Sequence, residues 1–182
     1  MSDTLFVTNY APETTEDDLR ALFGEYGDVV DISSGISDRT EQPYVVIEMA
    51  SQKVATRALN ALNGYAMGEY FLAVSYTEVD VTRDLTSKQR RVMDEILETL
   101  GETEKIPVRQ IEAMVRLCGL SFVEAITREA VAVDAGEGME TSEGTRRTVG
   151  GIFFYLARHR MSPAVRRIVY NRKGKMPPEE TA

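Results

Sequence analysis

The order of strand-like and helix-like patterns in residues 1–80 limits the fold more than any other feature of the chain. Short runs rich in β-branched and aromatic residues alternate with segments whose apolar residues recur at helical spacing. The first helical segment opens at Thr15, with Asp18 three residues later as in a capping box, and it stops at Gly27. The order predicts a ferredoxin-like βαββαβ domain. Its expected strands are 5–10, 29–33, 44–49 and 70–76, and its expected helices are 15–26 and 51–62.

Residues 86–176 carry a different pattern, which predicts a small all-α helical domain. Three helical segments are followed by a glycine-containing loop or extended hairpin at 134–148 and by two more helices. The chain is therefore expected to be an α+β two-domain protein, with domains at 1–80 and 86–176, a linker at 81–85 and a tail at 177–182. The expected helix starts are the capping boxes Thr86 with Gln89 and Ser121 with Glu124, Pro107 in a first turn, the pair Gly150 and Gly151, and Ser162 followed by Pro163.

The two halves differ in charge, although the whole chain has a formal net charge of -8. Residues 1–81 hold 4 bases and 14 acids, a net of -10, whereas residues 82–182 hold 17 bases and 15 acids, a net of +2. The segment from Gly144 to Lys175 contains nine cations and no acid. A polyanion should be repelled by the first half and attracted to this segment. The nine cations are Arg146, Arg147, Arg158, Arg160, Arg166, Arg167, Arg172, Lys173 and Lys175.

Residues 3–78 resemble the RNA recognition motif. Leu5 to Tyr10 is similar to the shorter ribonucleoprotein hexamer of that family, and 58–64 is similar to its second helix. The resemblance implies that Phe6 and Tyr44 stack on RNA bases from the open face of the sheet. The sequence departs from the family where Gln42 replaces a basic residue and Val46 an aromatic one. RNA binding by this domain alone is therefore expected to be weak.

A second use of the same sheet stays open. An acidic surface with few stacking rings is equally suited to docking a protein, including the basic second half of the chain. If Leu72 and Val74 faced the same way as Phe6, this surface would also be more apolar.

Residues 86–173 resemble the RNA-binding domain of the phosphorylated adaptor for RNA export, chiefly through the segment from Thr145 to Phe153. Val149 stands where that family has proline. The resemblance implies a compact helical domain that binds single-stranded RNA with little sequence preference. A glycine pair at a helix start also leaves backbone N–H groups open to a phosphate. The candidate RNA-binding residues are Phe6, Tyr44, Arg146, Arg147, Gly150, Gly151, Arg158, Arg160, Arg166 and Arg167.

Catalytic and metal chemistry find little support in the sequence. A single cysteine, Cys118, and a single histidine, His159, argue against a disulfide framework and against Cys- or His-based metal sites. No phosphate-loop motif and no nucleophile with an adjacent base is evident. We therefore expect a protein that is not an enzyme and needs no cofactor. The absence of a long apolar run or a signal peptide predicts no membrane association, and the compact layout predicts a cytoplasmic location.

These observations favour a non-catalytic RNA-binding protein that contacts single-stranded RNA mainly through its basic C-terminal domain. The alternative is a protein-interaction or autoinhibitory module, in which the acidic N-terminal domain docks on the helical domain or on a partner protein.

Overall fold

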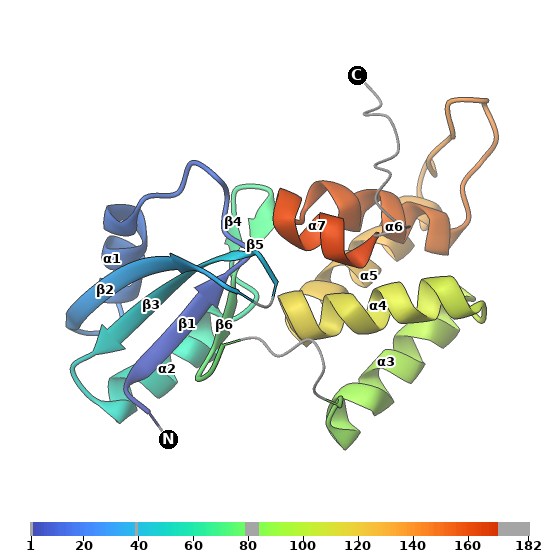
Figure 1. The fold of residues 1–182 in the computed structure, drawn as a ribbon. Helices are drawn as coiled ribbons and strands as arrows, with labels where there is room; N and C mark the ends of the chain where they lie inside the picture. Colours follow the sequence, from blue (N-terminus) through green and yellow to red (C-terminus); the bar gives the residue numbers. More distant parts are fainter. Residues whose placement is uncertain (1, 39, 79–83, 171–182) are drawn as a thin grey trace.

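The computed structural model describes residues 2–38, 40–78 and 84–170, which form an α/β domain and a helical domain that contact each other (Figure 1). The α/β domain contains β1 (Thr4–Thr8), α1 (Glu16–Gly24), β2 (Val29–Ile36), β3 (Pro43–Met49), α2 (Gln52–Leu62), β4 (Ala66–Met67), β5 (Tyr70–Phe71) and β6 (Ala73–Ser75). The predicted βαββαβ order is confirmed, with one difference at its end.

The predicted last strand, 70–76, is divided at Leu72. Its first part, β5, pairs with β4 in a small two-stranded sheet, and its second part, β6, joins the main sheet. Leu72 breaks the pairing because its N–H donates to the Tyr65 carbonyl and its own carbonyl accepts from Gly64 N–H. Leu72 and Val74 are buried in the core between sheet and helices, so they do not add to the open face.

The main sheet has the strand order β2-β3-β1-β6 and is antiparallel throughout. Successive residues of a strand point to opposite faces. Leu5, Val7, Val45 and Ile47 are buried beneath α1 and α2, together with Phe23 and Leu62 from the helices. Phe6 pairs with Val46 of β3 and with Ser75 of β6. Phe6, Tyr44 and Val46 therefore share the opposite, helix-free face.

The helical domain contains α3 (Ser87–Leu100), α4 (Lys105–Cys118), α5 (Leu120–Ala135), α6 (Val149–His159) and α7 (Pro163–Val169). Phe122, Phe153, Ile111, Met114 and Leu117 are among its fully buried side chains. The predicted loop or hairpin before α6 contains a single β-bridge between Glu140 and Arg146. Figure 1 shows this segment projecting from the domain between α5 and α6.

Most of the predicted helix starts are confirmed. Thr86 and Gln89 form a complete capping box, and the Ser162 side chain accepts from Val165 N–H ahead of Pro163. The capping box at Ser121 and Glu124 is wrong, because α5 already begins at Leu120. Gly119, with φ of 83°, ends α4 and starts α5 without an intervening loop. Ser121 instead lies against Gly64 of the α/β domain.

The domains are joined by an apolar contact and by a buried asparagine. Phe71 of β5 belongs to the core cluster of the helical domain, where its ring meets that of Phe122 edge-on at 5.7 Å. Asn9, at the end of β1, donates to the Phe71 carbonyl at 2.8 Å and accepts from Ser162 N–H at 2.9 Å. Glu41 and Arg167 form an exposed salt bridge of 2.8 Å across the same boundary. The contact is therefore mainly apolar and hydrogen-bonded.

Candidate nucleic-acid interface

Phe6 and Tyr44 form a pair of rings on the open face of the main sheet. Their centroids are 5.9 Å apart, their planes are inclined by 42°, and both residues are partly exposed. Tyr44 lies across Gly35 of β2, because a Cβ added at Gly35 would be 2.7 Å from the Tyr44 hydroxyl oxygen. The sequence pattern identified the two rings, but it did not reveal that Gly35 makes room for one of them.

The start of α6 is not the open phosphate site that its glycines suggested. Thr148 caps the helix, and its hydroxyl oxygen accepts from Gly151 N–H at 3.1 Å. Gly150 is buried, and the carboxylate of Glu102 occupies the space next to its Cα. A negative side chain at a helix N-terminus takes the position that a phosphate would need. The expectation that Gly150 and Gly151 present free N–H groups to an anion is therefore wrong.

Arg146 and Arg147 are neighbours in sequence but have different surroundings. Arg146 donates to the Asp134 carbonyl at 2.6 Å, forms a salt bridge with the Asp134 carboxylate at 3.4 Å, and packs against Gly138. Arg147 lies over the ring of Tyr155, 5.0 Å from its centroid, in a cation–π contact. Its Nε donates to the Glu140 carbonyl at 3.4 Å. Arg146 thus links the loop before α6 to Asp134 near the end of α5. The positive charge of Arg147, in contrast, has no acidic partner among the described residues.

The three consecutive aromatics of α6 are divided between core and surface, as expected for a helix. Phe153 is fully buried, and Phe154 packs edge-on against it and against the core. Tyr155 is partly exposed and lies beside the exposed His159, and the centroids of their rings are 4.5 Å apart. Arg147, Tyr155 and His159 therefore lie next to one another, and the Tyr155 and His159 rings are inclined by 43°.

Arg158 and Arg166 lie near Tyr170, just beyond the end of α7. The Tyr170 hydroxyl donates to the Phe154 carbonyl at 3.1 Å, which ties the end of α7 to α6. Burial raises the pKa of Tyr170, and the positive charges of Arg158 and Arg166 oppose that rise. Within residues 84–170, neither arginine has a carboxylate in salt-bridge range.

Arg160 and Arg167 each form a salt bridge within the protein. Arg160 forms a salt bridge with Glu129 at 3.0 Å and lies 5.9 Å from the centre of the Phe71 ring. Arg167 pairs with Glu41. Of the six predicted arginines, Arg147, Arg158 and Arg166 are thus without an acidic partner in the described part of the chain, and we call them the unpaired arginines. Arg172, Lys173 and Lys175 lie outside the described residues.

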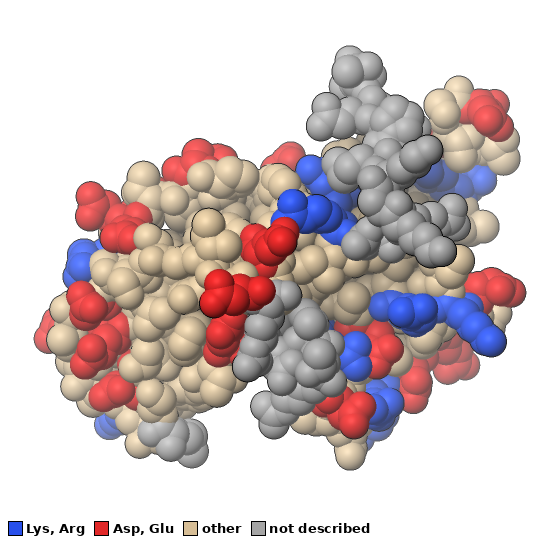
Figure 2. Space-filling model, in the orientation of Figure 1, with Lys and Arg blue, Asp and Glu red and all other residues tan. Residues whose placement is uncertain are grey.

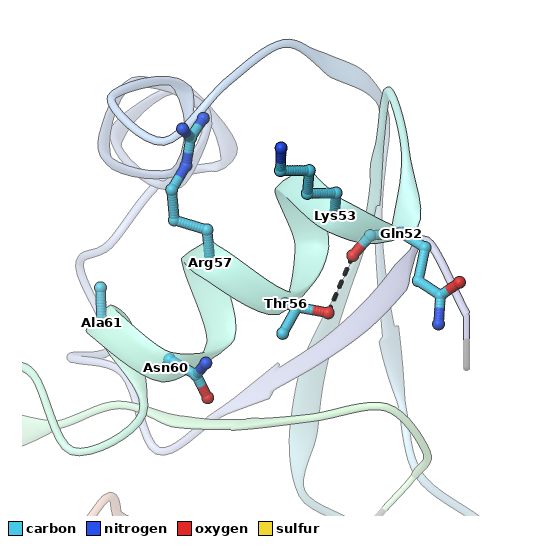
Figure 3. A pocket seen from close by; sticks show the side chains of 6 residues that line it. All are labelled: Gln52, Lys53, Thr56, Arg57, Asn60 and Ala61. Atoms are coloured by element: carbon cyan, nitrogen blue, oxygen red, sulfur yellow. Dashed lines mark hydrogen bonds between the residues drawn. The ribbon is translucent and has the colours of Figure 1, made fainter.

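The surface view shows how charge is distributed over the two domains. In Figure 2, charged atoms over the α/β domain are mostly red, whereas blue and red atoms both lie over the helical domain. A separate hollow lies along the outer side of α2, where Lys53 and Arg57 project beside Thr56 (Figure 3). Arg57 donates to the Tyr26 carbonyl, so it links α2 to the end of α1. This hollow lies on the helical side of the domain, away from Phe6 and Tyr44.

Chemically reactive groups are scarce among the described residues. Cys118 is fully buried, and burial raises the pKa of its thiol, so the thiolate form is disfavoured. The described residues contain no cluster of His, Cys, Asp and Glu that could hold a metal ion. None of the helices described is long and apolar enough to cross a membrane.

Comparison with known families assigns a class to both domains. A family model for the RNA recognition motif matches residues 5–72. The model for the RNA-binding domain of the phosphorylated adapter RNA export protein matches residues 92–175. The chain thus contains a region that matches the RNA recognition motif, followed by a helical region that matches the RNA-binding domain of the export adapter. Both family models describe RNA-binding domains.

Individual relatives match less than half of the chain. Protein elav of Drosophila melanogaster is 39% identical over 74 residues, which are 40% of this chain and 15% of elav. Protein elav of Drosophila virilis is also 39% identical over 74 residues, 40% of this chain and 14% of that protein. The similarity thus spans a minor part of each relative. Among solved structures, the Rna15 RNA recognition motif with bound RNA (GU) is similar at 22% identity and a TM-score of 0.38, covering 50% of this chain and 96% of that one.

Proposed function

We propose that this protein binds single-stranded RNA with low sequence specificity, mainly through the helical domain. The observation that carries the proposal is the set of unpaired arginines on the helical domain, with Arg147 over Tyr155 and with Arg158 and Arg166 near Tyr170. Cations without a carboxylate partner attract phosphates and release counterions from RNA. Tyr155 contributes through the cation–π contact that holds Arg147 beside α6. Phosphate contact does not depend on base identity, which accounts for the low specificity.

The RNA recognition motif contributes less affinity in this proposal. Its open face offers the Phe6–Tyr44 pair, but Val46 does not provide a third ring. Alanine substitution at a stacking ring costs about 1–3 kcal/mol per base. The acidic charge around this domain opposes RNA, so the stacking is useful once the helical domain has already captured the strand. A cytoplasmic location is part of the same proposal.

Adjacent arginines provide a matched test. Arg147→Ala removes an unpaired charge, whereas Arg146→Ala removes one already paired with Asp134. We expect Arg147→Ala to weaken binding to unstructured RNAs of different sequence by a similar factor of about 3–10, corresponding to roughly 1 kcal/mol. Arg146→Ala should weaken binding less. Fluorescence anisotropy with several labelled RNAs measures both, and an unchanged Kd for Arg147→Ala would contradict the assignment.

A specific contact also favours an autoinhibitory role for the α/β domain. Glu41 pairs with Arg167 across the domain boundary, where it neutralises a cation that RNA would otherwise attract. Both side chains are more than half exposed, so the salt bridge is weak and easily exchanged. If Glu41 restrains RNA binding, Glu41→Gln should tighten it. An equal or weaker affinity of this variant for RNA would argue against autoinhibition and would indicate that the two domains bind RNA together.

A further inference from the structure

A small recess at one end of the open sheet face contains polar atoms without partners among the described residues. Gln42 and Thr8 are 1% and 5% exposed, and neither the Gln42 side-chain amide atoms nor the Thr8 hydroxyl has a hydrogen-bond partner in the described part of the chain. Buried polar groups are nearly always hydrogen-bonded, since an unpaired one is destabilising. Two such side chains lining one recess therefore have room for a partner that the described residues do not supply.

The recess adjoins the two rings on the sheet. Phe6 and Thr8 are alternate residues of β1, and Tyr44 follows Gln42 by two residues, so all four side chains lie on the open face. All four line the recess, together with Glu78. The Glu78 carboxylate accepts a hydrogen bond from the Ser37 hydroxyl, which closes one side. The recess with Gln42 and Thr8 thus lies next to the two rings.

The size of the recess fits the edge of a base and not a whole ring. Its free volume is about 10 Å³, room for a single water or for one exocyclic atom. A ligand atom gains affinity when it replaces a water and reproduces its hydrogen bonds. The side-chain amide of Gln42 offers a donor and an acceptor side by side, which matches the paired donor and acceptor on a base edge.

We propose that Gln42 and Thr8 form a base-reading site, which recognises the hydrogen-bonding edge of one unpaired RNA base stacked on the Phe6–Tyr44 pair. The site rests on the proposed RNA-binding function and deepens it. The helical domain supplies affinity that is independent of sequence, and this site adds a modest preference for one base. Glutamine at position 42 has no charge for a phosphate, so its contribution is directed to a base instead.

The test compares binding of oligo(A), oligo(C) and oligo(U) of equal length to the full chain and its variants. Gln42→Met and Thr8→Val keep the side-chain volume nearly constant and remove the hydrogen-bonding atoms. Gln52→Met, at an exposed position of α2, is the matched control. We expect the wild-type protein and the control to prefer one oligomer by about tenfold. Both recess variants should bind all three oligomers with nearly equal affinity, at an unchanged salt dependence.

Two outcomes would overturn the base-reading site, and they differ from failure of RNA binding itself. The first is a wild-type protein that binds the three oligomers equally, and the second is a recess variant that keeps the wild-type preference. A protein that binds none of them would instead contradict the proposed function. Should a variant fail to fold, the wild-type side-chain NH₂ resonances of Gln42 decide the question. They should shift on addition of the preferred oligomer, and resonances that stay in place would exclude the contact.

Discussion

At the scale of single residues, the charge of a side chain matters less than its partners. Arg146 and Arg147 are adjacent and were indistinguishable in the sequence, yet one is paired with Asp134 and the other lies over Tyr155. The same is true of Gly150, which was expected to expose an N–H group and instead lies against Glu102. Sequence spacing located these residues in the correct loop and helix. It could not supply contacts with Asp134 and Glu102, because these come from other parts of the chain.

The contact between Gly150 and Glu102 predicts a coupling between the two positions. Gly150→Ala alone adds a methyl group where the carboxylate lies and displaces it from the N-terminus of α6. In a Glu102→Ala background the same change should be at least about 1 kcal/mol more favourable, since alanine is also the better helix former. Urea unfolding of the four proteins measures this difference. Gly151→Ala is the control and should show no coupling, and additive effects at 102 and 150 would refute the contact.

At the scale of elements, the sequence correctly predicted the helix starts that are fixed by contacts within one helical turn. The capping boxes at Thr15 and Thr86 and the Ser162 cap are satisfied by residues within one helical turn, and all three are present. The Ser121 cap and the continuous strand 70–76 were wrong. Ser121 lies against Gly64 of the α/β domain, and Leu72 N–H donates to the Tyr65 carbonyl. Contacts with other parts of the chain therefore decide both structures.

The capping box of α1 predicts a dependence on acid. The Asp18 carboxylate accepts from the Thr15 hydroxyl at 2.6 Å and from Thr15 N–H at 2.9 Å, and these bonds lower the pKa of Asp18. Because the folded pKa lies below the unfolded value of about 4, the stabilisation is present above pH 4 and is lost as pH falls through the folded pKa. Asp18→Asn should therefore be less stable than the wild type at pH 7, and the difference should shrink below pH 4. Chemical unfolding at both pH values tests this, and a difference independent of pH would refute it.

At the scale of the whole molecule, the two domains share part of one core. The halves and their fold classes could be read from periodicity, but the contact through Phe71 could not, because β5 is a two-residue strand with no pattern of its own. The sequence suggested attraction between unlike charges at this boundary. The structure places there a buried asparagine and two phenylalanine rings, with one exposed salt bridge.

This shared core predicts coupled unfolding. Phe71→Ala should cost about 3–5 kcal/mol and separate the melting of the two domains, because its ring packs in the core of the helical domain. Calorimetry should show one transition for the wild type and two for the variant. Phe6→Ala, which removes a ring from the open sheet face, should leave a single transition. Two transitions already in the wild-type protein would contradict the coupling.

The unpaired arginines carry most of the proposed RNA binding, and the salt dependence of this binding tests them directly. The comparison is between a triple alanine variant of Arg147, Arg158 and Arg166 and a triple variant of the paired Arg146, Arg160 and Arg167. For single-stranded RNA each phosphate contact contributes about 0.7 to the slope of log K against log salt. The first variant should bind with a slope smaller in magnitude than the wild type by about 2, and the second should stay close to the wild type. Equal slopes for the first variant and the wild type would contradict the central claim.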